Sequence, residues 1–378
     1  MGASLPLFPH QRFHGIFCII AQKAGEYKLC SPAYIIKGLE ILKNSSFNMT
    51  TGKPLKNILI FAIPIMLSGL VQQCYNVADT YIVGQYISAN ALAAVGSVGP
   101  MNSLLMGLAM GITGGFAIPV AQSFGAGNKK LTNHYAGNAI SLTIIISLLI
   151  MSMSLFLVKP ILRLLGTPDV IFNDARVYVS IIYAGAIFTT LYNVLASILR
   201  ALGDSKAPLK FLAITAILNV FLNYFTIAVL GMGVDGAAIS TVLSQLVSCI
   251  LCVIYIRRRK EMLNITREDF KIKKTTAVLM LKMGVPMSLQ FSITGIGSMV
   301  LQSTINTYGP SIMAGFTIAN KPELLANIPL SATGVACATY AGQNFGAGRM
   351  DRVRQGAKSA TLFAGSMSVI MSTILYFF

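Results

Sequence analysis

Residues Ile58–Val83 read ILIFAIPIMLSGLVQQCYNVADTYIV and carry one charged side chain, Asp79. A helix of this length crosses a bilayer, because about 20 predominantly apolar residues suffice. A carboxylate in hydrocarbon is costly, so the helix should turn Asp79 towards the interior of a helix bundle or a wet cavity. The stretch therefore predicts a membrane protein in which Asp79 is the first candidate for function.

Three further polar side chains precede Asp79 at helical spacing. Asn76 lies three residues before it, Tyr75 four and Gln72 seven, so we expect them on the same face of the helix. We interpret this face as part of a polar pathway through the membrane. The alternative is a protonated Asp79 that only hydrogen-bonds a neighbouring helix.

The composition excludes an ordinary soluble domain. Charged residues make up 11% of the chain, against roughly a quarter in soluble proteins, and the mean hydropathy is +0.69. A formal charge of +17 would suggest a nucleic-acid partner in a soluble protein. Here the basic residues lie between apolar stretches, so we expect them to orient the chain in a bilayer and expect no nucleic-acid partner. The sequence shows no metal-ligand spacing, nucleophile and base pair or phosphate loop, so we predict neither an enzyme nor a bound cofactor.

Length and hydropathy predict about nine membrane spans. They are 58–83, 92–121, 136–158, 172–199, 208–230, 236–256, 279–305, 312–342 and 355–378. Lys and Arg gather in the loops on one side, so the positive-inside rule predicts a cytoplasmic N-terminus. On that side lies the basic linker Arg257–Lys274, which we interpret as a solvated loop in preference to a specific lipid or partner site.

These spans divide the chain into four parts. We predict an N-terminal extension, an N-terminal lobe of six helices, a basic cytoplasmic linker and a partial C-terminal lobe of three helices, at residues 1–48, 49–256, 257–274 and 275–378. The extension lacks the features of a signal peptide. We interpret it as disordered or as preceding the natural start at Met49.

Two motifs recur at one offset. QSFGAGN from Gln122 returns as QNFGAGR from Gln343, 221 residues later, and AIP ending at Pro64 returns as GVP ending at Pro286, 222 residues later. Six spans separate the copies, and an even number returns the second copy in the same orientation. The sequence therefore predicts an all-α integral membrane protein of two parallel-repeat helical lobes, an architecture typical of alternating-access transporters.

Several motifs in order carry a resemblance to a known family. They are QQCYNVADTYIVG (72–84), AQSFGAGN (121–128), RALGDSKAP (200–208), GVDGAAIST (233–241), and IANKPE followed by GQNFGAG in the second half. Over about residues 50–378 the chain resembles a bacterial multidrug and toxic compound extrusion (MATE) transporter. That family has twelve spans, so we expect the second lobe here to lack its last three helices.

The resemblance implies roles for residues of the first lobe. In the family a carboxylate of the first helix takes part in cation coupling, and Asp79 occupies the matching position. Asn219 and Asn223 lie four apart on the fifth span and resemble a family pair whose second member is often Asp. We predict that these three residues couple transport to H⁺ or Na⁺; the alternative for the two Asn residues is bonding to neighbouring helices.

In the second half, Lys321 and Glu323 flank Pro322 inside the eighth span. Glu323 could attract a cationic substrate, or the two side chains could form an internal ion pair. We place both residues, with Gln72, Tyr75 and Asn76, on the predicted substrate pathway.

The resemblance implies a secondary active antiporter that exports lipophilic or cationic compounds in exchange for H⁺ or Na⁺. We expect small-molecule substrates and a monomer in the lipid bilayer of the bacterial inner membrane. Two alternatives stay open: a flippase for a lipid-linked saccharide, and a truncated membrane protein that does not transport.

Overall fold

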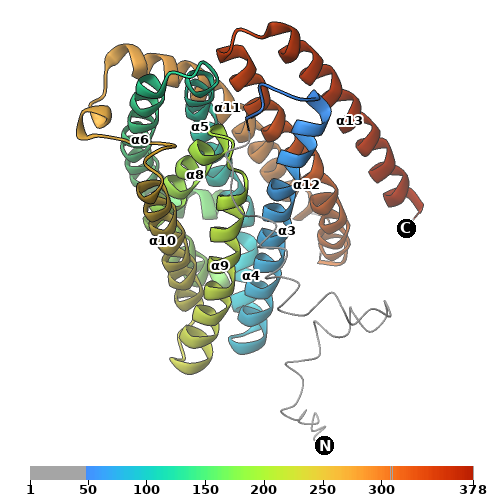
Figure 1. The fold of residues 1–378 in the computed structure, drawn as a ribbon. Coiled ribbons are helices and arrows are strands. Elements are labelled where there is room, and N and C mark those ends of the chain that lie inside the picture. Colours follow the sequence, from blue (N-terminus) through green and yellow to red (C-terminus); the bar gives the residue numbers. More distant parts are fainter. Residues whose placement is uncertain (1–47, 307, 309, 378) are drawn as a thin grey trace, which may run out of the picture. The chain divides into compact units, whose positions relative to one another are not determined.

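The computed structural model describes residues 48–306, 308 and 310–377. The predicted extension at 1–48 lies outside these residues except for its last position. The regular elements of the described part are all helices (Figure 1). They are α3 (Pro54–Tyr86), α4 (Ala89–Ser97), α5 (Gly99–Gly125), α6 (Lys129–Leu164), α7 (Asp169–Ala184), α8 (Ala186–Ala201), α9 (Lys206–Asn223), the π-helix η1 (Tyr224–Val229), α10 (Val234–Arg258), the 3₁₀ helix η2 (Arg267–Phe270), α11 (Lys274–Asn306), α12 (Pro310–Gly346) and α13 (Met350–Phe377).

The predicted all-α membrane fold is confirmed. Seven stretches of the described residues are long and apolar enough to span a bilayer, or eight if α7 and α8 form one broken span bent by 45°. We predicted that span, 172–199, as one helix, but it breaks at Gly185. The predicted span 92–121 is likewise α4 followed by α5, with the break just before Pro100, which removes a backbone donor.

The predicted ninth span is the exception. Its described residues, 355–377, belong to α13, which is not among the seven or eight candidate spans of the described residues. It is the least apolar of the long helices, because Arg352, Arg354 and Lys358 occupy its first turns.

Small residues bring α5 and α11 together. Gly107, Gly111 and Gly115 recur every four residues along α5. A Cβ added at Gly115 would overlap the backbone of Gly284, and one at Gly111 would overlap the backbone of Ser288. Because lipid is as apolar as a side chain, close packing of small residues of this kind is a main source of helix association in a membrane.

The repeated FGAG motif forms the same turn twice. Gly127 and Gly348 have φ of 70° and 74°, a left-handed conformation that favours glycine. In each copy the backbone N–H after the glycine donates to the carbonyl five residues earlier, from Asn128 to Ser123 and from Arg349 to Asn344. The two helices that end here, α5 and α12, cross at Gly125 and Gly346. A Cβ on either glycine would overlap the Gln carbonyl of the other motif.

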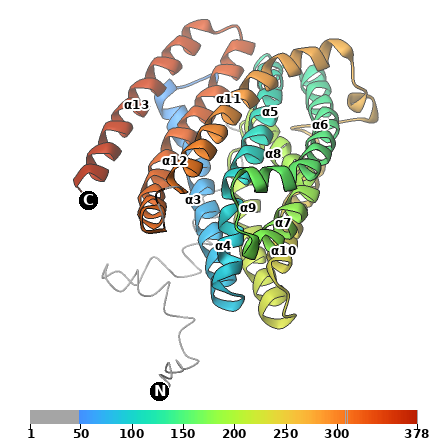
Figure 2. The ribbon, with the colours of Figure 1, turned by 180° about the vertical axis from the view of Figure 1, so that it is seen from behind.

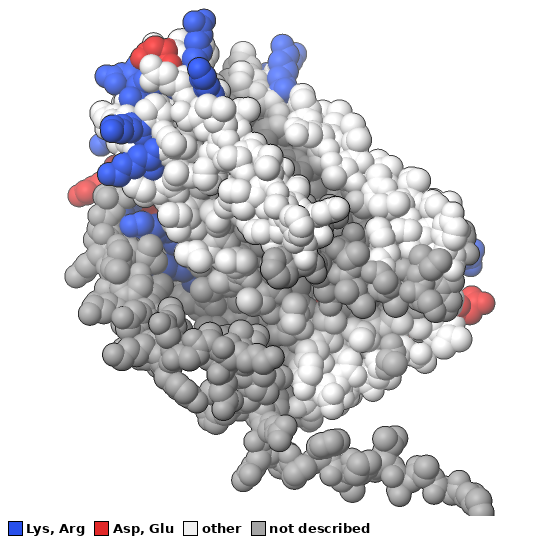
Figure 3. Space-filling view, turned by 90° about the vertical axis from the view of Figure 1, so that its right-hand side faces the viewer, with Lys and Arg blue, Asp and Glu red and all other residues white. Residues whose placement is uncertain are grey.

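Lys and Arg side chains gather at one end of the molecule, at the upper left of Figure 3. We call it the basic end: there α5 and α12 finish, α13 begins and the chain passes from α10 to α11 (Figure 1).

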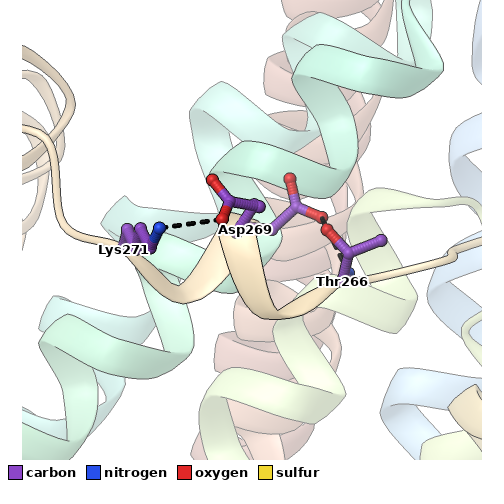
Figure 4. Close-up of polar contacts among 4 residues, drawn as sticks. Thr266, Asp269 and Lys271 are labelled. Carbon is purple, nitrogen blue, oxygen red and sulfur yellow. Dashed lines mark hydrogen bonds and ion pairs between the residues drawn. The ribbon is translucent and has the colours of Figure 1, made fainter.

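The linker is exposed over most of its length, as expected of a solvated loop, but it also packs on the first half. Its first two residues belong to α10 and its last, Lys274, begins α11. Between them the chain packs on α6, where the Ser141 hydroxyl donates to the Phe270 carbonyl at 2.9 Å. The linker also folds locally: Thr266 and Asp269 form a capping box around η2, and Lys271 pairs with Glu268 at 2.8 Å (Figure 4). Composition alone does not reveal such a contact, because it depends on side chains of α6.

Candidate functional site

Asp79 lies buried in the first half, with 8% of its surface exposed. One oxygen of its carboxylate accepts a hydrogen bond of 2.6 Å from the side-chain amide of Asn223. The same amide donates at 2.9 Å to the side-chain carbonyl of Asn219. Both asparagines are fully buried. The structure thus brings together the three residues that we predicted for cation coupling, which we call the Asp79 cluster.

The geometry of α9 positions this cluster. Thr215, Asn219 and Asn223 recur every four residues and form a buried polar stripe on the helix. After Asn223 the helix widens into η1, and single π-helical turns are frequent at functional sites. The Thr226 hydroxyl in η1 donates to the Leu222 carbonyl at 2.9 Å and lies 3.0 Å from the Ser240 hydroxyl of α10. These bonds tie the turn after Asn223 to a neighbouring helix.

Sequence reasoning missed two residues that lie near Tyr75. The Thr241 hydroxyl of α10 lies 3.0 Å from the Tyr75 hydroxyl. Tyr178 of α7 is buried and lies close enough to interact electrostatically with Asp79 and Tyr75. The sequence does carry a signal for Thr241, because this residue is the last of the family motif GVDGAAIST. Tyr178 stands in an apolar run without one.

The cluster holds unused hydrogen-bonding capacity. Within the described structure, the side-chain N of Asn219 and the side-chain O of Asn223 are buried without partners. Leaving such a group unpaired costs about 1–3 kcal/mol. A carboxylate, an amide oxygen and nearby hydroxyls suit a hard cation such as Na⁺, whose protein ligands are oxygens, and a carboxylate alone accepts a proton. Among the described residues no group of three His, Cys, Asp or Glu side chains converges to hold a transition metal.

A second buried carboxylate gives a contrast. Asp204 is 8% exposed, like Asp79, but it accepts three hydrogen bonds. They come from the backbone of Lys206 and Ala207 and from the hydroxyl of Tyr255. These contacts begin α9 and join it to α10, as an N-terminal cap does. Asp204 is therefore satisfied by the fold, whereas Asp79 accepts a single bond in the described structure.

The predicted polar face of α3 splits into two parts. Asn76 is exposed and accepts a long hydrogen bond of 3.5 Å from Gln72, whereas Asp79 is buried and Tyr75 partly so. At about 100° per residue, Asn76 and Tyr75 project on opposite sides of Asp79. Within the described residues Gln72 bonds Asn76, and neither side chain hydrogen-bonds the Asp79 cluster. Their place on the pathway stays a prediction.

The remaining predicted residues lie in the second half. Lys321 and Glu323 belong to α12, but their side chains fall outside the described part of the structure. Their assignment to the pathway and the alternative ion pair stay predictions.

Comparison with known proteins agrees with this architecture. The MatE family model matches residues 64–225 and 286–378. The chain is 31% identical over 309 residues to the probable multidrug resistance protein YpnP of Bacillus subtilis, covering 82% of this chain and 69% of that protein. It is 28% identical to the probable multidrug resistance protein YoeA of the same organism, covering 79% of this chain and 66% of that protein. The chain thus spans about two thirds of these relatives.

A solved structure of similar fold is the outward-facing conformation of a MATE family transporter of the MOP superfamily. It superimposes with a TM-score of 0.80 at 26% identity and covers 88% of this chain and 74% of that one. The match to the MatE family model begins at Pro64 in α3, the helix that contains Asp79. It resumes at Pro286, the counterpart of Pro64 in the second copy of the repeat. With the family model matched in both halves, this chain belongs to the MATE family of multidrug efflux transporters.

Proposed function

We propose that the protein acts as an antiporter that exports lipophilic or cationic small molecules in exchange for H⁺ or Na⁺. In this proposal Asp79 binds the coupling cation. The observation that carries it is the Asp79 cluster: a buried carboxylate with one hydrogen-bond donor, beside an amide oxygen of Asn223 that has no partner within the described structure. Asp204, by contrast, has its carboxylate occupied by contacts that begin α9 and join it to α10.

The cluster also joins α3 to α9, and α3 in turn packs on the second half. Asp79 belongs to α3, which packs on α9 through Asn223 and on α12 of the second half. Binding of a cation removes the charge that attracts the Asn223 amide and therefore changes the free energy of the contact between α3 and α9. A ligand shifts a conformational equilibrium only through such a difference between states. We propose that cation binding favours the state that releases the compound.

Transport by the 378-residue chain in proteoliposomes tests this proposal. The assay follows uptake of a fluorescent lipophilic cation, driven either by a pH gradient without Na⁺ or by a Na⁺ gradient at equal pH. Asp79→Asn keeps the shape of the side chain and removes its charge. Asp169→Asn makes the same change at an exposed carboxylate in the first turn of α7 and serves as the control.

We expect one gradient to drive uptake and Asp79→Asn to reduce it at least 100-fold, about 2.7 kcal/mol, while Asp169→Asn stays near the wild-type rate. Uptake by Asp79→Asn at the wild-type rate would refute the role of this residue. If neither gradient drives uptake of the dye by the wild type, a flux assay with a lipid-linked saccharide tests the flippase alternative. Absence of both fluxes would support the non-transporting alternative.

We further propose a monomer in the bacterial inner membrane with its basic end in the cytoplasm. The charge distribution of Figure 3 supports this orientation through the positive-inside rule. In a cysteine-free variant, Lys260→Cys in the linker should react with an impermeant maleimide in inside-out vesicles and stay unlabelled in intact cells. Labelling in intact cells would reverse the orientation.

A further inference from the structure

The part of the linker from Met262 to Lys273, which we call the strap, is held on the first half at both of its ends. Leu263 is buried, and Met262 and Ile265 pack against the hydrophobic core that α5, α6, α8 and α10 share. Further along, the side-chain amide of Asn138 donates to the carbonyl of Asp269 at 2.9 Å, and its oxygen accepts from the backbone of Lys273 at 3.3 Å. The backbone of the strap therefore faces α6.

A glycine on α6 permits this close approach. A Cβ added at Gly137 would overlap the carbonyl of Asp269. Since the neighbour is backbone rather than a flexible side chain, any larger residue at Gly137 must push the strap away from α6. The strap is thus seated by geometry and not only by charge.

Because the backbone of the strap packs against α6, two of its large apolar side chains point away from the protein core. Phe270 and Ile272 are 42% and 41% exposed. The Phe270 carbonyl is bound by Ser141, and one turn further along α6 begin exposed apolar side chains at Ile144 and Ile145. Because such a face of a spanning helix meets hydrocarbon, Phe270 and Ile272 lie near the boundary between hydrocarbon and water.

Basic residues flank this apolar pair in the sequence: Arg267, Lys271 and Lys273 lie within the strap and Lys274 follows it. The linker 257–274 carries eight Lys or Arg and three Asp or Glu, a net charge of +5. Two of the acids are occupied within the strap: Glu268 pairs with Lys271, and Asp269 caps η2 (Figure 4). Six exposed basic residues of the linker have no ion-pair partner in the described structure: Arg257, Arg258, Lys260, Arg267, Lys273 and Lys274.

We propose that the strap is a binding surface for the headgroups of anionic phospholipids. Lys and Arg attract the phosphate, and Phe270 and Ile272 enter the boundary between headgroups and acyl chains, as apolar side chains of interfacial segments do. The proposal depends on the membrane fold and not on the proposed transport. It takes up the lipid site that the sequence analysis ranked below a simple solvated loop.

Lipid titration of the purified full chain tests the surface. The ligand is dioctanoyl phosphatidylglycerol in a neutral detergent, with dioctanoyl phosphatidylcholine and glycerol 3-phosphate as parallel arms, and native mass spectrometry counts bound molecules. Arg267→Gln with Lys273→Gln removes two charges from the strap. The control pair, Arg354→Gln with Lys358→Gln, removes two exposed charges from α13 at the same end of the molecule.

At about 1 kcal/mol per basic residue, the strap pair should weaken phosphatidylglycerol binding roughly 30-fold, and the control pair less than threefold. The wild type should bind phosphatidylcholine and glycerol 3-phosphate far more weakly, since one lacks net charge and the other lacks acyl chains. Equal losses in the two pairs, or no loss in the strap pair, would overturn the proposal. Equal binding of glycerol 3-phosphate would reduce the surface to a phosphate site and also overturn it.

A second variant tests the seating without changing charge. Gly137→Ala should displace the strap from α6 and weaken phosphatidylglycerol binding, with Ser141→Ala as a milder change at the same contact. Unchanged binding by a folded Gly137→Ala protein would show that net charge alone attracts the lipid. Thermal unfolding of each variant identifies those that fail to fold, and for them the charge pairs decide.

Discussion

The two halves of the molecule, residues 49–256 and 275–378, meet along two helix–helix interfaces, which we call seams. The seams use equivalent helices but differ in side-chain packing. In the first seam, α5, which belongs to the second span of the first half, packs on α11, the first span of the second half. In the second seam, α12 packs on α3, so the roles of the halves are exchanged (Figure 2). Parallel repeats related by rotation about one axis produce such an exchange.

The residues at matching positions differ in size. In the first seam Gly115 meets Gly284 backbone to backbone. By the offsets of 221 and 222, the matching residues of the second seam are Ala336 and Ala62, both buried in a cluster with larger side chains. Glycine permits a closer approach of two helices than alanine, so the first seam is the tighter one. We expect it to keep its packing while the second seam adjusts during transport.

One pair of positions shows the exchange directly. Gly107 of α5 faces Phe291 of α11, whereas in the second seam Gly69 of α3 faces Ile328 of α12. In the first seam the large residue, Phe291, lies on α11. In the second seam the large residue, Ile328, lies on α12. The repeat fixes the arrangement of the helices, and each seam distributes side-chain volume in its own way.

The largest loss of stability is expected where α5 and α12 cross, between the two seams. Gly125→Ala and Gly346→Ala should each lower the free energy of unfolding by about 3 kcal/mol, because the new methyl group meets a backbone carbonyl. Both clashes are relieved by the same separation of the helices, so the double variant should cost less than the sum. Gly334→Ala on α12, with open space around its Cβ, is the control for thermal unfolding in detergent. Additive effects would show that the two clashes are independent.

Within the first seam, Gly115→Ala should cost about 2 kcal/mol, since its methyl group overlaps the backbone of Gly284. Gly114→Ala, one residue earlier on the same helix, meets only the end of the Met287 side chain at 3.4 Å. It should be neutral or stabilising by up to about 1 kcal/mol, because alanine favours a helix over glycine. Thermal unfolding of both variants checks the difference, and equal losses would refute backbone contact in this seam.

The smallest effect is expected in the second seam. A methyl group at Gly69 would lie 2.8 Å from Cγ2 of Ile328, a side-chain atom that shifts more readily than backbone does. Gly69→Ala should therefore cost about 1 kcal/mol, less than Gly115→Ala. The same unfolding measurement ranks the two, and a larger loss at Gly69 would reverse the order of the seams.

Much of this fold could be predicted from the sequence. Hydropathy located most of the helices, and the recurrence of the FGAG motif predicted the two equivalent halves. The contact between Gly125 and Gly346 could not be predicted, because an offset shows that two segments are equivalent and not that they touch. The contact between the linker and α6 was missed for a related reason. It depends on Asn138 and Ser141, which are ordinary residues of a spanning helix.

The candidate site was predicted in part. A charge in an apolar span identified Asp79, and spacing placed Asn219 and Asn223 on one face, but only the structure shows that the Asn223 amide binds Asp79. The π-helical turn after Asn223 leaves no trace in hydropathy. Tyr178 was missed because a tyrosine in an apolar run has no distinguishing pattern.

The proposed antiport depends most on Asp79, the residue that exchanges a cation for the exported compound. Cation release on addition of a transported compound measures this directly, with a pH indicator in weak buffer and a Na⁺-selective electrode. The wild type and Asp169→Asn should release about one cation per bound compound, and Asp79→Asn none. Release of the same cation in the same amount by a folded Asp79→Asn protein would contradict the account.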